Sequence, residues 1–102
     1  MRAAKRLFHW MIAGTAGGVN RGRILQALID QPRNANALAN ELHLDYKTVQ
    51  HHLKMLKKNQ LIVAQGSGYG VVYFPSEIIE DNLEDFYSVW NKIGKNDLNK
   101  KR

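Results

Sequence analysis

Apolar residues recur every three or four positions along the first 60 residues, the spacing at which side chains share one face of a helix. The first run predicts a short amphipathic helix over residues 3–13, which the glycines of GTAGG end. The second predicts a helix that Asn20 caps and that stops before Pro32, because proline disfavours helical backbone in the residue before it.

The third and fourth apolar runs lie close together, and only the tight turn HLD separates them. Asn36 should cap a very short third helix. Asp45 should cap the fourth and longest helix of this half, which continues to about Asn59. His43 occupies the turn position where many such helix pairs have glycine, and histidine tolerates left-handed backbone better than most residues.

After residue 60 the pattern changes from helical spacing to short β-branched and aromatic runs. LIVAQ and VVYF predict two strands, and GSGYG between them predicts a flexible hairpin tip. Pro75 should end the second strand and Ser76 should cap a final helix that runs to Ile93. Residues 94–102 should fray as a basic tail.

Helix, helix, turn, helix and then a two-stranded hairpin is the order of a winged helix-turn-helix. The predicted fold class is therefore mainly α with a β-hairpin, a winged helix-turn-helix with extra N- and C-terminal helices. The 102 residues suffice for one domain and not for two. Within residues 1–102, we expect residues 1–13 and 76–93 to supply the dimerisation helices.

Charge narrows the choice of partner. The net charge of +6 and a pI near 9.8 favour a polyanion, nucleic acid before an anionic membrane surface. Residues 1–60 hold ten Lys/Arg against three Asp/Glu, or +7, whereas residues 61–102 hold five against six, or −1. The basic surface therefore belongs to the first 60 residues.

Several classes of protein do not fit the composition. The chain has no cysteine, which excludes disulfides, thiolate metal sites and cysteine nucleophiles. No apolar run approaches the length of about 20 residues that spans a membrane. The N-terminal sequence only loosely resembles a signal peptide, because its apolar run is short and contains His9. We expect a cytoplasmic protein. No catalytic set is visible, so we expect no enzyme.

The fourth helix contains two adjacent histidines whose side chains should point about 100° apart. A helical wheel places Val49, Leu53 and Leu56 on the buried side, with His52 at its edge and His51 on the outer face among lysines. Two histidines chelate a metal well at i and i+4 rather than as neighbours. We therefore expect no metal site here, and a ring nitrogen of His52 should bond a backbone group at the edge of the core.

The outer face of this helix carries the candidate chemistry, since the second helix of a helix-turn-helix enters the major groove. Gln50 can form a pair of hydrogen bonds with adenine, and His51 or Lys47 can donate a hydrogen bond to guanine. The hairpin tip has no cation, so it either approaches phosphate through Tyr69 and backbone amides or stays idle. The candidate DNA-binding residues are Tyr46, Lys47, Thr48, Gln50, His51, Lys54, Lys57, Lys58, Arg21, Arg23 and Tyr69.

TVQHHLKMLKKNQLI closely resembles the recognition helix and following strand of ArsR-like winged-helix transcriptional regulators. The longer sequence from GTAGG to NQLI is similar to a small archaeal branch of them, and the resemblance extends from Gly14 to about Phe74, roughly 60% of the chain. It implies a dimeric double-stranded DNA binder that regulates transcription, most often as a repressor. Metal-sensing members use cysteines or Asp/His pairs that this chain lacks, so no metal or other cofactor is expected.

The terminal helices carry apolar stripes that must be buried. We expect the terminal helices of two chains to pack together as a homodimer; the alternative is that one chain folds them against its own core. Two other functions stay open, a winged-helix module that binds protein or RNA, and a membrane-surface protein that uses Arg2, Lys5 and Arg6. The candidate interface residues are Leu7, Phe8, Met11, Ile12, Ile79, Leu83, Phe86, Trp90 and Ile93.

Overall fold

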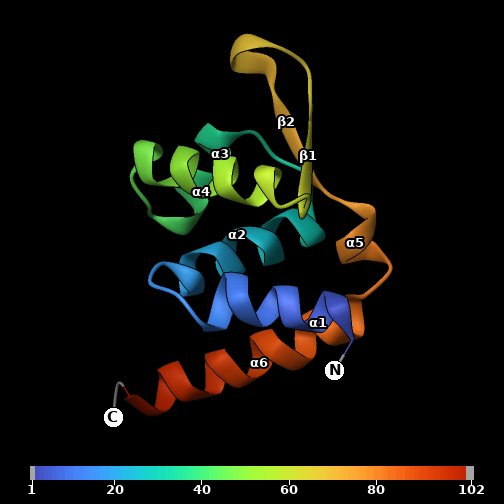
Figure 1. Cartoon of the computed structure of the whole chain (residues 1–102). Coiled ribbons are helices and arrows are strands. Elements are labelled where there is room, and N and C mark those ends of the chain that lie inside the picture. Colours follow the sequence, from blue (N-terminus) through green and yellow to red (C-terminus); the bar gives the residue numbers. More distant parts are fainter. Residues whose placement is uncertain (1, 101–102) are drawn as a thin grey trace.

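The computed structural model describes residues 2–100, except for the side chains of Tyr69 and of residues 94–100. Within these residues the strands β1 and β2 pair antiparallel, with Val63 opposite Phe74, and project as a wing from a bundle of helices (Figure 1). The fold is the predicted winged helix-turn-helix. Its elements are α1 (Ala3–Phe8), the π-helix η1 (His9–Ala13), α2 (Gly18–Asp30), α3 (Ala35–Leu42), α4 (Tyr46–Lys58), β1 (Ile62–Gln65), the 3-10 turn η2 (Gly68–Gly70), β2 (Val72–Pro75), α5 (Glu77–Glu80) and α6 (Leu83–Lys100).

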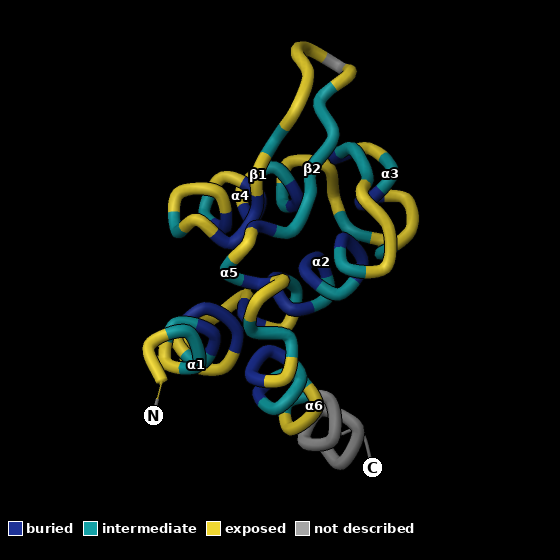
Figure 2. The backbone as a smooth tube through the Cα atoms, turned by 90° about the vertical axis from the view of Figure 1, so that its right-hand side faces the viewer, coloured by how far each residue is buried: buried dark blue, intermediate teal, exposed yellow. Residues whose placement is uncertain are grey.

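One hydrophobic core connects all the helices. The helix α2 lies in the middle, with α3 and α4 towards the wing and α1 and α6 at the opposite end (Figures 1 and 2). Leu25 and Leu28 of α2 are fully buried, as are Leu38 of α3 and Leu56 of α4. The wing tip is exposed (Figure 2). The core therefore fixes the helix-turn-helix and leaves the outer side of α4 free.

The capping of α4 and the turn before it follow the sequence. A carboxylate oxygen of Asp45 accepts the backbone N–H groups of Lys47 and Thr48 at 3.0 and 3.3 Å, which confirms the predicted cap. His43 adopts φ 57°, ψ 44°, so histidine takes the left-handed position in the turn. The end of the helix at Lys58 lies one residue before the predicted one.

The predicted cap of α3 is wrong. Asn34, not Asn36, accepts the backbone N–H of Ala37, at 2.8 Å, and the helix begins at Ala35. Both asparagines have capping chemistry, but Arg33 forms a β-bridge with Tyr73 of the wing. This extended pairing ends directly before Asn34, which therefore stands at the junction of extended and helical backbone where a cap is needed.

The predicted cap of α2 is also wrong. The helix begins at Gly18, and Asn20 lies inside its first turn, where it accepts a hydrogen bond from Arg23 at 3.0 Å. The backbone decides the start. Gly17 adopts φ 80°, and a Cβ on Gly18 would stand 2.5 Å from the carbonyl oxygen of Ile12. Only glycine allows this left-handed entry and close approach.

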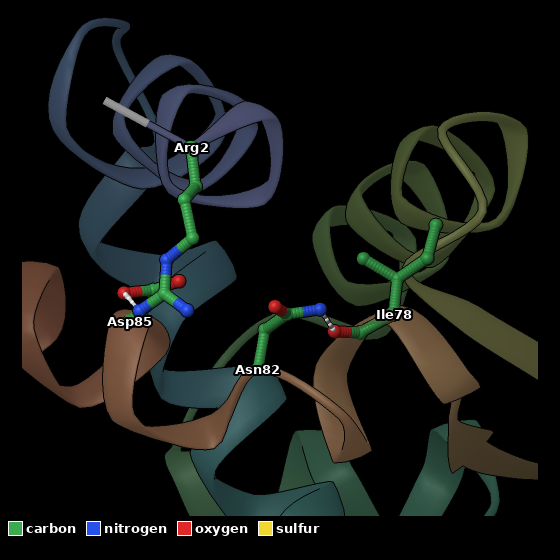
Figure 3. A network of polar contacts seen from close by, with 4 residues as sticks. All are labelled: Arg2, Ile78, Asn82 and Asp85. Carbon is green, nitrogen blue, oxygen red and sulfur yellow. Dashed lines mark hydrogen bonds and ion pairs between the residues drawn. The ribbon is translucent and has the colours of Figure 1, made fainter.

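The predicted helix from Ser76 is divided into α5 and α6. The Ser76 hydroxyl donates to the carbonyl of Gln60 at 2.7 Å and makes no cap bond. The side chain of Asn82 donates to the carbonyl of Ile78 at 2.8 Å (Figure 3). Such side-chain bonds compete with the helical pattern, which explains the break at residues 81 and 82. The backbone of residues 94–100 belongs to the helix α6, which continues to Lys100, and residues 101–102 of the expected basic tail lie outside the described part.

The terminal helices pack against each other within one chain. The rings of Phe8 and Phe86 lie edge to face at 6.0 Å, and Arg2 forms an ion pair with the buried Asp85 at 2.9 Å (Figure 3). This packing buries five of the residues expected to form a dimer interface, and for them the expectation is wrong, because a side chain inside one chain cannot contact a partner. They are Phe8, Met11, Ile12, Ile79 and Phe86. Leu7, Leu83, Trp90 and Ile93 stay half-buried.

Candidate nucleic-acid interface

The helix α4 separates an apolar side from a polar side as the helical wheel predicted. Val49, Leu53 and Leu56 are at most 1% exposed. The groups on the other side are open to solvent, with Tyr46 44% exposed and Thr48 and Gln50 half-buried at the margin. The exposed residues of this outer face are Tyr46, Lys47, His51, Lys54, Lys57 and Lys58. Five groups that can be cationic thus project from one helix, without a carboxylate among them.

One side chain of the outer face is held in place by another. The amide nitrogen of Gln50 donates to the hydroxyl of Tyr46 at 2.6 Å. The two residues are one turn apart on the exposed side of α4, so the bond fixes the direction of the amide. An amide held in this way loses less conformational freedom when it bonds the edge of a base.

Two hollows lie between α4 and the wing, and α3 closes the first of them. The first, of about 500 Å³, lies between α3, the start of α4 and the wing, and the second, of about 480 Å³, lies along α4 beside β2. Lysine and histidine line the second, so an anionic group there would meet positive charge. The linings are Asn34, Ala35, Asn36, Tyr46, Gln50, Gly68, Val71 and Tyr73 for the first, and Lys47, Gln50, His51, Leu53, Lys54, Lys57 and Tyr73 for the second.

Tyr73 lines both hollows, although the sequence analysis did not single it out. Burial, followed by the nearby Tyr46, raises the pKa of the Tyr73 phenol above its usual value. The phenol therefore stays a neutral hydrogen-bond donor. The alternation of VVYF places Tyr73 and Val71 on one side of the strand, and this signal could have indicated a tyrosine that faces α4.

His52 lies on the inner side of α4 and is 6% exposed, as its position at the edge of the core predicted. The predicted hydrogen bond to a backbone group is wrong for Nδ1, which is buried without a partner among the described residues. Burial lowers the pKa of the imidazole, and the charges of Arg21 and His51 lower it further. The ring packs against Gly17, where an added Cβ would stand 2.9 Å from His52 Cε1, and the nearby charge of Arg21 disfavours a second cation.

The two candidate arginines of α2 do not join the outer face of α4. Arg21 is 4% exposed; its Nε donates to the carbonyl of Met11 at 2.7 Å, and its guanidinium also reaches the hydroxyl of Thr15. Arg23 is half-buried and donates to the carbonyl of Leu42 at 2.6 Å. Both guanidinium groups connect elements of the fold. The side chain of Tyr69, the third outlying candidate, lies outside the described residues.

Charge on the rest of the molecule is distributed unevenly around this face. Residues 59–91 contain neither lysine nor arginine, so the wing, α5 and the first half of α6 have no such cation. Four exposed carboxylates begin just after β2, at Glu77, Glu80, Asp81 and Glu84. The outer face of α4 is therefore the place where an anionic polymer meets the least repulsion.

Two further findings concern the described residues only. They contain no group of three or more His, Cys, Asp or Glu side chains arranged to hold a metal ion. None of their helices combines the length and the apolar character needed to cross a membrane.

Comparison with known proteins finds a family model that is similar to part of this chain. The model of the family described as "Bacterial regulatory protein, arsR family" matches residues 19–63, which extend from α2 into β1. This segment of the chain is similar to the helix-turn-helix of the arsR family. The match supports a DNA-binding transcription regulator rather than an enzyme, and it confirms the resemblance seen in the sequence of α4.

Two solved structures share most of the fold of this chain. Reduced HlyU from Vibrio cholerae N16961 is 21% identical and superposes with a TM-score of 0.64 over 86% of this chain and 90% of its own. The transcriptional regulator BldR from Sulfolobus solfataricus is 16% identical, with a TM-score of 0.68 over 96% of this chain and 73% of its own. No similar sequence was found among curated proteins. At these identities the structures establish the fold.

Proposed function

We propose that this chain is a sequence-specific regulator that places α4 in the major groove of double-stranded DNA. The observation that carries the proposal is the outer face of α4, where a tyrosine-held glutamine stands beside Lys47, His51 and Lys54 without any carboxylate. An α-helix of this kind fits the major groove, and the preceding helix of the motif crosses the backbone.

The residues on this face divide into two groups by chemistry. Gln50 has an amide that can donate to adenine N7 and accept from N6, and His51 or Lys47 can donate to guanine. Tyr46 supports Gln50, and Thr48 can contact a thymine methyl group. The lysines further along α4, Lys54, Lys57 and Lys58, would neutralise phosphates and position the helix without reading sequence.

The proposal includes a two-fold homodimer. The half-buried Leu7, Leu83, Trp90 and Ile93 are the apolar groups of the terminal helices that a second chain could cover. Two copies of α4 would then meet successive major grooves about 34–36 Å apart, and the binding site would be an inverted repeat. We propose repression as the mode of regulation, since a dimer on such a site can block access of the transcription machinery.

Selection of binding sites from random duplex DNA tests the proposal, followed by affinity measurements on the selected site and on its single-base variants. Gln50→Ala should relax the preference at one base pair per half-site. Gln31→Ala is the matched control, because Gln31 is exposed after the end of α2 and outside the proposed interface. Absence of any duplex binding at low salt would refute the proposal.

Light scattering tests the dimer separately. Leu7→Glu and Ile93→Glu should each give monomers that keep their helical content, whereas Val63→Glu, at a 46% exposed site on β1, should stay dimeric. A monomeric wild type would contradict this part. Loss of dimer should also weaken binding to the inverted repeat far more than to a single half-site.

The wing favours one alternative function. With no cation on the wing, part of the surface that would lie beside the DNA backbone has no charged group to hold phosphate. A winged-helix module that binds RNA or protein is the second candidate, and titrating an RNA hairpin beside the DNA duplex distinguishes the two. Tighter binding to the RNA, with no preference among duplex sequences, would support it.

A further inference from the structure

A third depression lies on the side of α4 that faces away from the wing. Its volume is about 330 Å³, and one wall comes from another element, the π-helix η1. The residue from η1 is Trp10, which is 53% exposed and is the most exposed of the large apolar side chains in the described residues. The lining residues are Trp10, His51, Lys54, Met55, Lys58 and Asn59. The N-terminal helix runs below α4 in Figure 1.

The backbone of η1 holds Trp10 in this exposed position. Met11 and Ile12 of the same turn are fully buried, and they attach the segment to the core. The wider π-turn closes with the N–H of Gly14 donating to the carbonyl of His9 at 2.8 Å. Arg21 holds the carbonyl of Met11 from the other side. A half-exposed tryptophan on a backbone fixed in this way calls for a functional explanation, because π-turns occur frequently at functional sites.

The other walls of the depression select an anion. Lys54 and Lys58 supply the charge, His51 can donate a hydrogen bond, and none of the lining residues is acidic. His51 and Lys54 also line the hollow beside β2, so the two depressions share one ridge of α4. A polyanion that lies on the outer face of α4 therefore reaches Trp10 without leaving positive surface.

We infer that Trp10 and Lys58 contact the phosphodiester backbone of DNA beside the groove that α4 enters, on the flank opposite the wing. The indole N–H donates to a phosphate oxygen and Lys58 neutralises the same strand. The inference deepens the proposed function and rests on it. The π-helix η1 then holds the DNA backbone on one flank of the groove, which is the role that a basic wing would have on the other. This contact compensates for the lack of cations on the wing.

Fluorescence tests the contact directly, because the chain has only two tryptophans. In the Trp90→Phe variant Trp10 is the sole indole, and saturating duplex DNA should shift or quench its emission. In the complementary variant Trp10→Phe only Trp90 remains, and its emission should change much less when DNA is added. DNA binding that leaves the emission of Trp10 unchanged would overturn the inference. An equal shift caused by benzoate, at the ionic strength of the DNA titration, would also overturn it, because the depression would then be a site for a small aromatic anion.

Affinity measurements complete the test. Trp10→Ala should weaken binding to all duplex sequences by about tenfold, the loss expected for a hydrogen bond to a charged group. Lys58→Gln should reduce the slope of log K against log salt by about one per protomer. Val63→Ala is the matched control, because Val63 is similarly exposed but lines a hollow that contains Glu77 and Glu80.

The outcomes separate this inference from the proposed function. If wild type and Trp10→Ala bind DNA equally while Gln50→Ala loses preference, the flank contact is refuted and the regulator stands. If the wild type binds no duplex, both fail. If Trp10→Ala becomes monomeric in light scattering, Trp10 belongs to the interface between subunits and the inference is overturned.

Discussion

His52 is a polar residue on the inner side of α4, between the groove-facing residues and the core. Its pKa is lowered mainly by burial, so the folded chain binds fewer protons at this site than the unfolded chain does. The free energy of unfolding then rises with pH in the window below the unfolded value of about 6.5 and reaches its full value above it. The folded state thus favours the neutral form of His52.

We therefore predict that acidification from pH 7.5 to 5 lowers the midpoint of urea unfolding. His52→Leu should remove most of this dependence, and it should cost little at pH 7.5, because it also removes a buried nitrogen that has no partner. His51→Leu, at the exposed neighbouring position, is the control and should retain the dependence. An unchanged pH profile in His52→Leu would contradict the assignment.

Tyr46 and Gln50 form the only pair of side chains on the outer face of α4 for which the described residues show a mutual hydrogen bond. We predict that Tyr46→Phe lowers discrimination by roughly 1 kcal/mol at the same base pair at which Gln50→Ala lowers it by roughly 1–3 kcal/mol. Comparing affinities for the selected site and its single-base variants measures both. An equal loss for every sequence would mean that Tyr46 contacts the backbone itself.

Among the elements, α2 begins where a glycine allows close contact with η1. We predict that Gly18→Ala destabilises the fold by roughly 1–3 kcal/mol, because the new methyl group would meet the main chain of Ile12, which cannot move aside as a side chain could. Gly14→Ala is the control, since its Cβ would make ordinary contacts at 3.5 Å and its φ is −98°. Thermal unfolding of both variants is the measurement.

The helices also show which features a sequence determines locally. Asp45, the apolar stripe of α4 and the left-handed turn at His43 were predictable, because each depends on residues within one or two turns. The start of α2 was not, because it depends on contact between Gly18 and Ile12. The start of α3 depends on a β-bridge to a residue 40 positions away in the wing.

The candidate site shows the same division. The outer face of α4 follows from helical spacing alone, so Lys47, His51 and Lys54 lie where the wheel placed them. Strand alternation could have indicated the side on which Tyr73 lies, but the approach of Trp10 to α4 depends on contact between distant elements, which a local sequence pattern does not contain. Arg21 looked like a surface cation because its buried partners, carbonyl and hydroxyl groups of the preceding segment, have no signature in the sequence.

For the whole molecule we predict a strong dependence of DNA affinity on salt. Each lysine or arginine that neutralises a phosphate releases condensed counterions, and a dimer with about 4–8 such contacts should give a slope of log K against log salt of roughly −4 to −7. Filter binding or fluorescence anisotropy between 50 and about 200 mM salt measures it. A slope near zero would mean that the basic face of α4 is not the binding surface.

The separation of charge along the chain has a consequence for how quickly the protein finds DNA. The basic outer face of α4 and the carboxylates at Glu77, Glu80, Asp81 and Glu84 make the molecule an electric dipole, with its negative end beyond the last turn of α4. Near a polyanion this dipole experiences a torque that turns α4 towards the duplex before any contact forms. The association rate constant should then fall steeply with ionic strength, even for a duplex to which the chain binds without sequence preference.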